Sequence, residues 1–430
     1  MSLAIRYRLI DIARGTDSVG LLKSLRAWQF ESPEQLNART QKQLEQYFNE
    51  LREAVPMFRQ VTRFEDLPII DKPFVNQHLN ELMNPNFKGA VIRKKTGGST
   101  GVPLIYYTGV QSQSYLWAGI YLSWEVAGFK FGDKVAFLAG PSLFATGYKQ
   151  SIYFRLLNVT LLSAFNMTAE TMSEYGRQLQ NSAIRLLYGY PSAVHLLARH
   201  FLDAGKTLST NLRGIVCTAE TMTPVMRKDI EAAFGVPCYS QYGCHDAGVS
   251  AFECEHRNGF HLISTRSYTE VLPDGQFIST DLSNRTMFMP RYNTGDIVRQ
   301  SGRQCPCGRG FPLLDEVLGR QNDMVVDTRG TTVHSLFFIY LFREDVRILS
   351  FQVIFDETQL DVNLHVKQLD DQELALLEHN VREIISKTLV FKHLNIIYNL
   401  PFTSLPNGKH SFVIRKSTLT NATQSSHVLS

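Results

Sequence analysis

A glycine- and hydroxyl-rich stretch at residues 95–103 offers the groups that bind a phosphate. It reads K-T-G-G-S-T-G-V-P, so three glycines alternate with three hydroxyl residues. Glycine lets a loop adopt positive φ and brings bare backbone amides close to a ligand, and successive N–H groups in such a loop form a concavity for anions. The stretch therefore predicts phosphate binding by Thr96, Gly97, Gly98, Ser99, Thr100 and Gly101.

Composition alone also fits two other interpretations of this stretch. One is a flexible linker. The other is the phosphate loop of P-loop NTPases, which requires G-x-x-x-x-G-K-[ST] after a strand. No Gly-Lys-Ser or Gly-Lys-Thr follows Gly97 and Gly98, so the sequence excludes the NTPase loop.

The spacing of the stretch resembles the T-[SG]-G-[ST]-T-G-x-P loop of the adenylate-forming superfamily. That group comprises acyl-CoA synthetases, peptide-synthetase adenylation domains and luciferases. The superfamily often carries a lysine beside the final proline, where this chain has Val102 and Leu104. The resemblance implies a site for ATP.

Residues 291–296 read R-Y-N-T-G-D and resemble the superfamily motif R-Y-x-T-G-D. The resemblance implies that Asp296 accepts hydrogen bonds from both ribose hydroxyls of ATP. A carboxylate suits this role because its two oxygens can accept from a vicinal diol. Standing alone, the motif would fit a β-turn that ends in Gly-Asp.

Residues 240–246 read S-Q-Y-G-C-H-D, follow an expected strand and resemble Y-G-x-[ST]-E. The resemblance implies that Tyr242 packs on adenine and that Asp246 helps to hold Mg²⁺. His245 occupies the place of the hydroxyl residue, where its imidazole could donate to the α-phosphate; the alternative is that it packs or bonds locally. The nucleotide-binding residues implied by this segment are Gln241, Tyr242 and Gly243.

Residues 214–220, G-I-V-C-T-A-E, resemble the strand-end G-[AG]-E segment that lines the adenine pocket of the superfamily. The residues implied here are Ala219 and Glu220. Ligands of α/β sheets bind at the carboxyl ends of the strands, so the end of a strand is the expected place for both residues.

Two further segments resemble the superfamily toward the C-terminus. Residues 318–323, L-G-R-Q-N-D, resemble the hinge motif G-R-x-D-D, which implies that Arg320 contacts the ribose. Asn322 replaces the first acid, so the pivot stays open between Asn322 and Asp323. Residues 405–409, L-P-N-G-K, precede Arg415 and resemble P-x-x-x-N-G-K-x-x-x-x-R. The resemblance implies that the catalytic Lys409 bridges carboxylate, α-phosphate and ribose oxygens, although Asn-Gly-Lys alone is a common hairpin turn.

The segments follow the superfamily order from about residue 90 to residue 416. The resemblance implies an acid–thiol ligase (AMP-forming), which activates a carboxylic acid with ATP, releases pyrophosphate and passes the acyl group to a thiol, CoA in the first instance. A carrier-protein thiol or an amine as acceptor, and a degenerate nucleotide-binding scaffold, stay open. The small C-terminal domain, the 188–192 segment Y-G-Y-P-S and the cysteines resemble the phenylacetate–CoA ligase branch, which includes relatives linked to capsular polysaccharide synthesis.

Some members of that branch carry a structural zinc ion held by a Cys/His pair and a Cys-x-Cys. In this chain Cys305-Pro-Cys307 is flanked by glycines, and Cys254 lies in E-C-E-H-R-N-G-F-H. Zinc prefers four tetrahedral sulfur or nitrogen ligands, and a closed set of four leaves no position for catalysis. The predicted ligands are Cys254, His261, Cys305 and Cys307, with His256 as the alternative fourth ligand and three unrelated thiols as the alternative to a site.

The expected acyl-binding residues are aromatic or apolar. They are Phe137, Tyr188, Tyr190 and Pro191, beside Ala219. Such a lining suits an aryl or medium-length acyl group. The same residues could equally serve sheet packing.

The element pattern predicts an α/β fold. Residues 1 to about 90 have a helical pattern, and short apolar strands at 135–139, 159–163, 184–188, 214–217 and 236–239 alternate with helices. This pattern predicts a parallel sheet flanked by helices. Ser192 is the expected cap of one helix, and Thr223 and Gly235 are the expected ends of the next. After residue 259 a strand–turn–strand pattern predicts an antiparallel piece.

Beyond residue 320 a small α+β domain is expected. Strands are predicted at 351–355, 360–366 and 393–398, and a helix at 371–388 with Leu377, Val381 and Ile384 on one face. We therefore expect an ATP- and carboxylate-binding domain at 1–320 and a mobile domain carrying the catalytic lysine at 321–430.

Composition narrows the class of protein. A hydrophobic content of 44% and a charged content of 20% are typical of a globular chain. A net charge of +4 over 430 residues is too small to indicate nucleic acid or an anionic membrane as partner. No run of about 18 apolar residues exists, and the first residues lack a secretory pattern. We expect a cytoplasmic enzyme that binds a small carboxylate and an acyl acceptor; a homodimer stays open.

Overall fold

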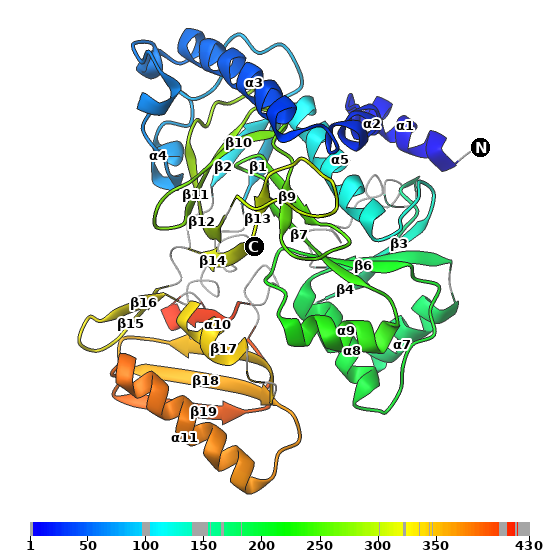
Figure 1. Ribbon diagram of the computed structural model, residues 1–430, viewed down its shortest axis with the longest axis vertical. Helices are drawn as coiled ribbons and strands as arrows, with labels where there is room; N and C mark the ends of the chain where they lie inside the picture. Colours follow the sequence, from blue (N-terminus) through cyan, green and yellow to red (C-terminus); the bar gives the residue numbers. More distant parts are fainter. Residues whose placement is uncertain are drawn as a thin grey trace, which may run out of the picture.

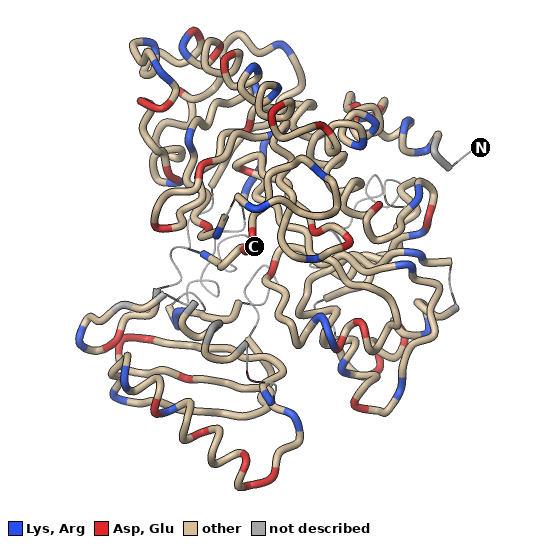
Figure 2. The backbone as a smooth tube through the Cα atoms, viewed as in Figure 1, with Lys and Arg blue, Asp and Glu red and all other residues tan. Residues whose placement is uncertain are grey.

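The computed structural model describes residues 3–96, 104–139, 154, 156–164, 167–181, 183–300, 302–320, 324–334, 336–343, 345, 347–403, 411–417 and 419. These residues form the predicted mixed α/β fold, with one large sheet, smaller antiparallel sheets and a C-terminal sheet covered by a helix (Figure 1). Among them no helix is both long and apolar enough to cross a membrane. Basic and acidic side chains are intermixed along the backbone (Figure 2), so no basic stripe is visible in this view.

Helices dominate the N-terminal region, as predicted. They are α1 (Leu3–Arg14), α2 (Ser18–Trp28), α3 (Pro33–Ala54) and α4 (Lys72–Gln77), with single 3₁₀ turns at Pro56–Phe58 and Phe64–Asp66. The sequence fixes the start of α3 by a capping box between Ser32 and Gln35. The apolar stripe of α3, including Leu44 and Leu51, is buried in the core of this region.

The large sheet has eight strands in the order β13-β9-β8-β7-β6-β5-β3-β4. Their bounds are β3 (Lys134–Ala139), β4 (Val159–Ser163), β5 (Ile184–Gly189), β6 (Gly214–Thr218), β7 (Cys238–Cys244), β8 (Val249–Glu253), β9 (Phe260–Leu262) and β13 (Leu313–Leu314). Strands β4, β3, β5, β6 and β7 are parallel, and β8, β9 and β13 extend the sheet in antiparallel pairs. The five predicted strands are therefore present.

One of these strands differs from its predicted bounds. The fifth strand was expected at 236–239, with the Q-Y-G-C segment after it, but β7 continues to Cys244. The reason is its partner β8, which pairs Gln241 with Phe252 and Cys244 with Val249. Pairing with a later segment thus keeps the Q-Y-G-C residues in the sheet, although they were expected to follow the strand.

Helices pack against this sheet. They are α5 (Val110–Val126), α7 (Ala169–Asn181), α8 (Pro191–Leu202) and α9 (Pro224–Phe234) (Figure 1). The predicted ends of α9 are confirmed, because the Thr223 side chain accepts from the Met226 amide and Gly235 has a φ of +68°. The predicted cap of α8 is wrong: Tyr190 is the N-cap residue and Ser192 lies inside the first turn. Pro191 sets this start, since its fixed φ suits the first helical position.

The remaining sheets of the first 320 residues are antiparallel. A hairpin pairs β1 (Ile92–Lys95) with β2 (Ile105–Thr108). A four-stranded sheet has the order β10 (Ser267–Val271), β11 (Gln276–Asp281), β12 (Tyr292–Arg299) and β14 (Glu316–Arg320). The predicted antiparallel piece is thus confirmed.

The C-terminal residues form a four-stranded sheet with its own hydrophobic core. The elements are β15 (Met324–Val326), β16 (Thr332–His334), α10 (Leu336–Arg343), β17 (Ile348–Phe355), β18 (Gln359–Val366), α11 (Asp371–Thr388), β19 (His393–Tyr398) and β20 (Val413–Arg415). The four-stranded sheet has the order β19-β18-β17-β20, and β15 and β16 form a separate hairpin. Helix α11 buries Leu377, Val381 and Ile385, whereas Ile384 is 42% exposed. The prediction for Ile384 is wrong because a spacing of four residues continues the buried stripe to Ile385.

Candidate nucleotide and acyl site

The carboxyl ends of β5, β6 and β7 meet at one edge of the large sheet. These strands are parallel neighbours, with Gly189 opposite Cys217 and Thr218 opposite Gln241. Ala219, directly after β6, has a φ of +72°, which is a strained conformation for a residue with a Cβ. Such strain is typical of functional sites, and this edge is where α/β sheets bind ligands.

Asp296 is the centre of a hydrogen-bonded cluster at this site. Its side chain is buried, its Oδ2 accepts from the Tyr242 hydroxyl at 2.6 Å, and its Oδ1 lies 2.9 Å from Nε of Arg320. Asp296 and Arg320 face each other across the β12–β14 pair. The nearby carboxylate raises the pKa of Arg320, and burial together with that carboxylate raises the pKa of Tyr242. The structure thus brings together three residues predicted from three separate motifs.

The R-Y-N-T-G-D segment shapes the backbone that presents Asp296. Gly295 has a φ of +74°, and its amide donates to the Asn293 side chain at 2.9 Å. The Thr294 hydroxyl accepts from the Asp296 amide at 3.1 Å and donates to the Phe277 carbonyl at 2.8 Å. The Asn, Thr and Gly of the motif therefore each have a local structural role.

Asp246 lies in the same region with two donors on its carboxylate. The Cys244 thiol donates to Oδ1 at 3.1 Å, and the Tyr292 hydroxyl donates to Oδ2 at 3.4 Å. Burial and the Asp246 charge raise the pKa of Tyr292. His245 is exposed beside them, and a Cβ added to Gly243 would contact its ring at 3.7 Å. A carboxylate held in this way offers the hard oxygen ligands that Mg²⁺ prefers.

Lys72 belongs to this neighbourhood although no sequence motif indicated it. Partial burial lowers its pKa, the Asp246 charge opposes that effect, and the Arg320 charge adds to it. Its position follows from tertiary pairing of the preceding residues, because Ile70 bridges Tyr292 of β12. The only local signal was the start of a helix, with Asp71 accepting from the Phe74 amide at 2.9 Å.

The expected acyl-binding residues lie within β3 and at the end of β5. Phe137 is 3% exposed and packs edge-on against Trp124, and Tyr188 packs against both rings. The Tyr188 hydroxyl donates to the Gln241 side chain at 2.9 Å. Pro191 is buried at the start of α8, and Tyr190 is half-buried as its cap. Phe137 is thus a core residue here, while Tyr188 links the core to the nucleotide edge.

Glu220 has a structural partner. One of its carboxylate oxygens accepts from the Ser192 amide at 3.1 Å, in the first turn of α8. Negative charge at a helix N-terminus is stabilising. This contact with the backbone of α8 accounts for the presence of Glu220 after β6 even when no ligand is bound.

A second cluster joins the four predicted metal ligands. The ligand atoms of Cys254, His261, Cys305 and Cys307 all lie within 4.8 Å of one another. The Cys254 and Cys305 sulfurs are 3.5 Å apart, and the Cys307 sulfur is 3.4 Å from Nε2 of His261. Tetrahedral Zn–S bonds of about 2.3 Å place sulfurs about 3.8 Å apart, so the donor set and its spacing fit zinc. Among the described residues, the fourth member of the group is His261 and not His256.

The surroundings of this cluster also suit a metal. Cys254 and His261 are fully buried, and burial lowers the pKa of the His261 imidazole to about 4, so the ring is held in the neutral form that binds a metal. Nδ1 of His261 faces the Phe311 carbonyl at 3.5 Å. Metal-bound histidines commonly donate their other ring nitrogen to such an acceptor.

Comparison with known proteins places these clusters in context. No family model matches the chain. Over 288 residues it is 29% identical to Protein CapK of Staphylococcus aureus, covering 62% of this chain and 60% of CapK. It is 31% identical to the phenylacetate–coenzyme A ligase of Thermus thermophilus over 34% of this chain and 36% of that protein. The chain is a homologue of CapK and the phenylacetate–CoA ligases. The matched stretches span less than two thirds of these relatives' own length.

The solved structure of 2-hydroxyisobutyryl-CoA ligase, in the postadenylation state with a bound acyl-AMP, has the same fold. The TM-score is 0.67 at 16% identity, and the match covers 94% of both chains. The homologue of CapK and the phenylacetate–CoA ligases therefore has the fold of adenylate-forming acyl-CoA ligases, as its motifs predicted.

Several predicted residues of this CapK homologue lie outside the described residues. They are Gly97, Gly98, Ser99, Thr100, Gly101, Asn322, Asp323 and Lys409. The flanks of the glycine-rich stretch are described: the Thr96 hydroxyl accepts from the Leu104 amide at 3.0 Å, and the Thr96 amide donates to the Leu104 carbonyl at 2.9 Å. These two bonds close the β1–β2 hairpin on either side of the stretch.

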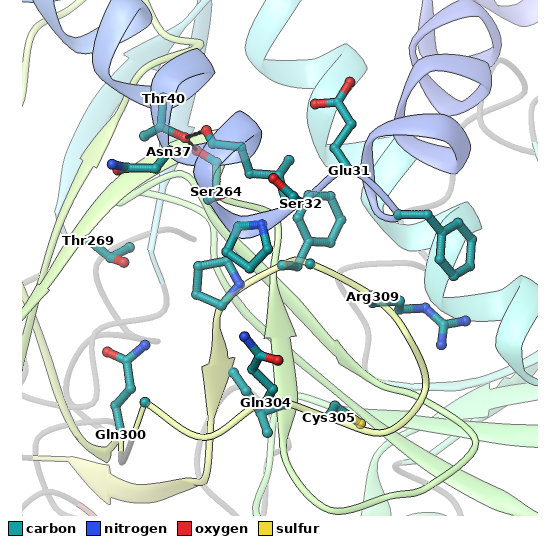
Figure 3. Close-up of a pocket in the computed structure, with 18 of the residues that line it drawn as sticks. Glu31, Ser32, Asn37, Thr40, Ser264, Thr269, Gln300, Gln304, Cys305 and Arg309 are labelled. Atoms are coloured by element: carbon teal, nitrogen blue, oxygen red, sulfur yellow. Dashed lines mark hydrogen bonds between the residues drawn. The ribbon is translucent and has the colours of Figure 1, made fainter.

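A cavity of about 540 Å³ lies beside the Cys/His cluster. Asn37, Thr40 and Ser264 lie along one wall and Gln300, Gln304 and Cys305 along another (Figure 3). The described residues that line it do not include Asp296, Tyr242 or Arg320. This cavity is therefore separate from the predicted nucleotide site.

Proposed function

We propose that this chain activates a carboxylic acid with ATP and then transfers the acyl group to the thiol of CoA. The observation that carries this proposal is that Tyr242 and Arg320 both contact the carboxylate of Asp296. The charge of Asp246 also acts on Arg320. The named relatives support it, because phenylacetate–CoA ligases and 2-hydroxyisobutyryl-CoA ligase form acyl-CoA thioesters by name.

In the proposed first step, a carboxylate oxygen of the acid attacks the α-phosphorus of ATP. The new O–P bond replaces the bond to the β-phosphate oxygen, so pyrophosphate leaves and an acyl-adenylate remains. Asp296 accepts from the ribose hydroxyls, while Arg320 and Tyr242 hold its two oxygens in place. Asp246 would hold Mg²⁺, which supplies charge neutralisation on the phosphates when bound.

In the second step, a thiol sulfur attacks the acyl carbon and AMP leaves with the bonding electrons. CoA is the acceptor that we propose. A carrier-protein thiol or an amine is the alternative acceptor. The similarity to CapK favours this alternative, because the name of CapK does not describe a CoA ligase.

Lys409 is the proposed cation of the first step. Removing one donor that stabilises a transition state typically lowers the rate by about 10²–10³-fold. We expect Lys409→Ala to slow acyl-adenylate formation by that factor while ATP still binds. Single-turnover formation of acyl-AMP measures the step, and a wild-type rate in the variant would exclude the assignment.

We also propose that Cys254, His261, Cys305 and Cys307 hold a structural zinc ion. The set has four sulfur or nitrogen donors and is buried, so a bound ion would have no open coordination position. Its role would be to join β9 to the 302–312 segment.

The experiment that tests the proposed function is carboxylate-dependent exchange of pyrophosphate into ATP without CoA. A panel of aryl, fatty, hydroxy and amino acids would be screened. Exchange with one class of acid establishes adenylation and names that class. If ATP binds but none of the acids supports exchange, the result favours a nucleotide-binding scaffold over an enzyme. If ATP does not bind, the assignment of the nucleotide site is wrong.

A further inference from the structure

Helix α1 carries an apolar stripe on the face that points away from the rest of the protein. This α1 stripe consists of Ile5, Leu9 and Ile12, which are 44%, 43% and 76% exposed. Their spacing of four and three residues places them on one face of the helix. Helix α1 lies at the edge of the molecule (Figure 1). Single exposed aliphatic residues need no explanation, but three on one helix face indicate a contact surface.

The opposite face of α1 is fixed to the body of the protein. Tyr7 and Ile10 are buried there, and the Tyr7 hydroxyl donates to the Leu157 carbonyl at 3.2 Å. The Tyr7 ring also packs edge-on against Tyr121 and Phe131, with ring centroids 5.5 and 4.8 Å away. The helix cannot turn the α1 stripe inward without losing these contacts, so the fold itself presents the stripe to the exterior.

The charges around the α1 stripe are basic. Successive helical residues are turned by about 100°, so Arg6 and Arg8 flank the stripe on its two sides, and within the described residues neither forms an ion pair. The one acid of α1, Asp11, is buried and accepts from two hydroxyls of the following turn, each at 2.7 Å. Residues 1–28 contain five basic and two acidic residues, a net +3 out of the +4 of the whole chain. The small overall charge therefore hides a local concentration of positive charge.

Two surfaces fit such a stripe: a second copy of this chain and an anionic lipid bilayer. Two copies of the α1 stripe brought face to face would bring their flanking arginines together, and like charges destabilise a contact. The stripe also lacks the aromatic residues in which protein interfaces are enriched. An anionic bilayer accepts aliphatic side chains at the level of its headgroups and attracts arginines beside them. The charge and composition of the stripe therefore favour the bilayer.

We infer that α1 binds the surface of an anionic lipid bilayer. Ile5, Leu9 and Ile12 insert among the headgroups, and Arg6 and Arg8 contact the lipid phosphates. The association is peripheral and reversible, because three aliphatic side chains bury little apolar area. It does not depend on the proposed nucleotide chemistry and would bring that chemistry to a membrane surface.

The test is co-sedimentation of the full chain with vesicles. Vesicles of phosphatidylglycerol and phosphatidylcholine in equal parts are compared with vesicles of phosphatidylcholine alone. We expect the chain to bind the anionic vesicles, less so at high salt because salt screens exposed charges, and to bind the neutral vesicles little. Ile12→Gln should weaken binding to the anionic vesicles by about tenfold, since full burial of an isoleucine corresponds to about ten- to one-hundred-fold in affinity. Arg8→Gln should weaken it by about fivefold, the contribution of one basic residue near an anionic surface.

Two matched controls lie outside α1. Leu9→Gln and Leu196→Gln each remove one leucine of equal exposure, 43% and 44%, but Leu196 lies on α8. Lys42→Gln removes an exposed basic residue from α3 and is the control for Arg8→Gln. Leu9→Gln should weaken binding to the anionic vesicles, whereas the two control variants should bind them as the wild type does.

Three vesicle results would overturn the inference. They are no co-sedimentation of the wild-type chain, equal binding of that chain to anionic and neutral vesicles, and equal binding by Leu9→Gln and Leu196→Gln. Sedimentation velocity tests the second copy as the alternative. If the wild-type chain is a dimer that dissociates in Leu9→Gln and binds no vesicles, the α1 stripe is a contact between copies and the inference is overturned as well.

Discussion

Replacing Asp296 with asparagine tests the proposed ribose contact most sharply. The substitution keeps the shape of the side chain and one acceptor oxygen but removes the negative charge. In the structure the two carboxylate oxygens face Tyr242 at 2.6 Å and Arg320 at 2.9 Å, so both are already oriented before a ligand binds. A ribose diol would add its hydroxyls to this prearranged carboxylate.

The expected magnitude follows from the loss of one charged acceptor. A hydrogen bond to a charged group contributes about 1.5–3 kcal/mol, which corresponds to about ten- to one-hundred-fold in affinity. The fold should survive, because the Arg320 side chain is 53% exposed and can return to water.

The assay compares ATP with 2′-deoxy-ATP on the wild-type chain and on Asp296→Asn. If Asp296 accepts from the ribose, the wild-type chain should bind the deoxy nucleotide at least about tenfold more weakly, and the variant should discriminate much less. Glu316→Gln is the matched control, because Glu316 pairs with Arg299 at 2.9 Å on the same two strands. That control should retain the wild-type preference.

Two results would refute this reasoning. Equal discrimination by wild type and Asp296→Asn would mean that the carboxylate does not contact the ribose. A loss of ATP binding in Glu316→Gln as large as that in Asp296→Asn would mean that breaking any ion pair between β12 and β14 disturbs the site.

Two more predictions concern stability. Cys305→Ser should lose the bound zinc and melt at a lower temperature than the wild type, as measured by elemental analysis and thermal unfolding; a metal-free wild-type chain would contradict the zinc site. Burial would raise the pKa of Asp327, but the backbone amides of Val390, Thr331 and Arg329 lower it to about 2, below the unfolded value of about 3.9. The stabilisation by the Asp327 carboxylate is therefore present above about pH 4 and is lost as the pH falls toward 2. Asp327→Asn should lower the free energy of unfolding in urea more at pH 7 than at pH 3. An equal loss at both pH values would contradict this prediction.

Much of the fold follows from local patterns in the sequence. Apolar runs predicted the parallel strands, and Thr223 and Gly235 correctly mark the ends of α9. Local patterns failed where a partner distant in the chain decides the conformation. Pairing with β8 extends β7 past Ser240. In the C-terminal sheet, Ile385 is buried in the core, whereas Ile384 is exposed.

The candidate site shows the same division. The resemblance of three motifs to the adenylate-forming superfamily implied that Tyr242, Asp296 and Arg320 share one ligand, and the structure brings the three residues together. Lys72 carried no such signal, because its place depends on the pairing of Ile70 with β12, far along the chain. Sequence reasoning therefore finds residues within motifs and misses those that tertiary pairing brings to the site.

The connection between β12 and β14 has a consequence for the conformational entropy of the Asp296–Arg320 pair. After β12 the chain crosses to the large sheet, where Leu313 of β13 pairs with His261 of β9, and only then returns as β14. Closing a loop costs entropy that grows with its length, and this anchoring point divides one long excursion into two short ones. Arg320 is therefore held opposite Asp296 by a chain whose freedom has already been reduced at β13. On the proposed function, loosening β13 should therefore weaken nucleotide binding through the position of Arg320.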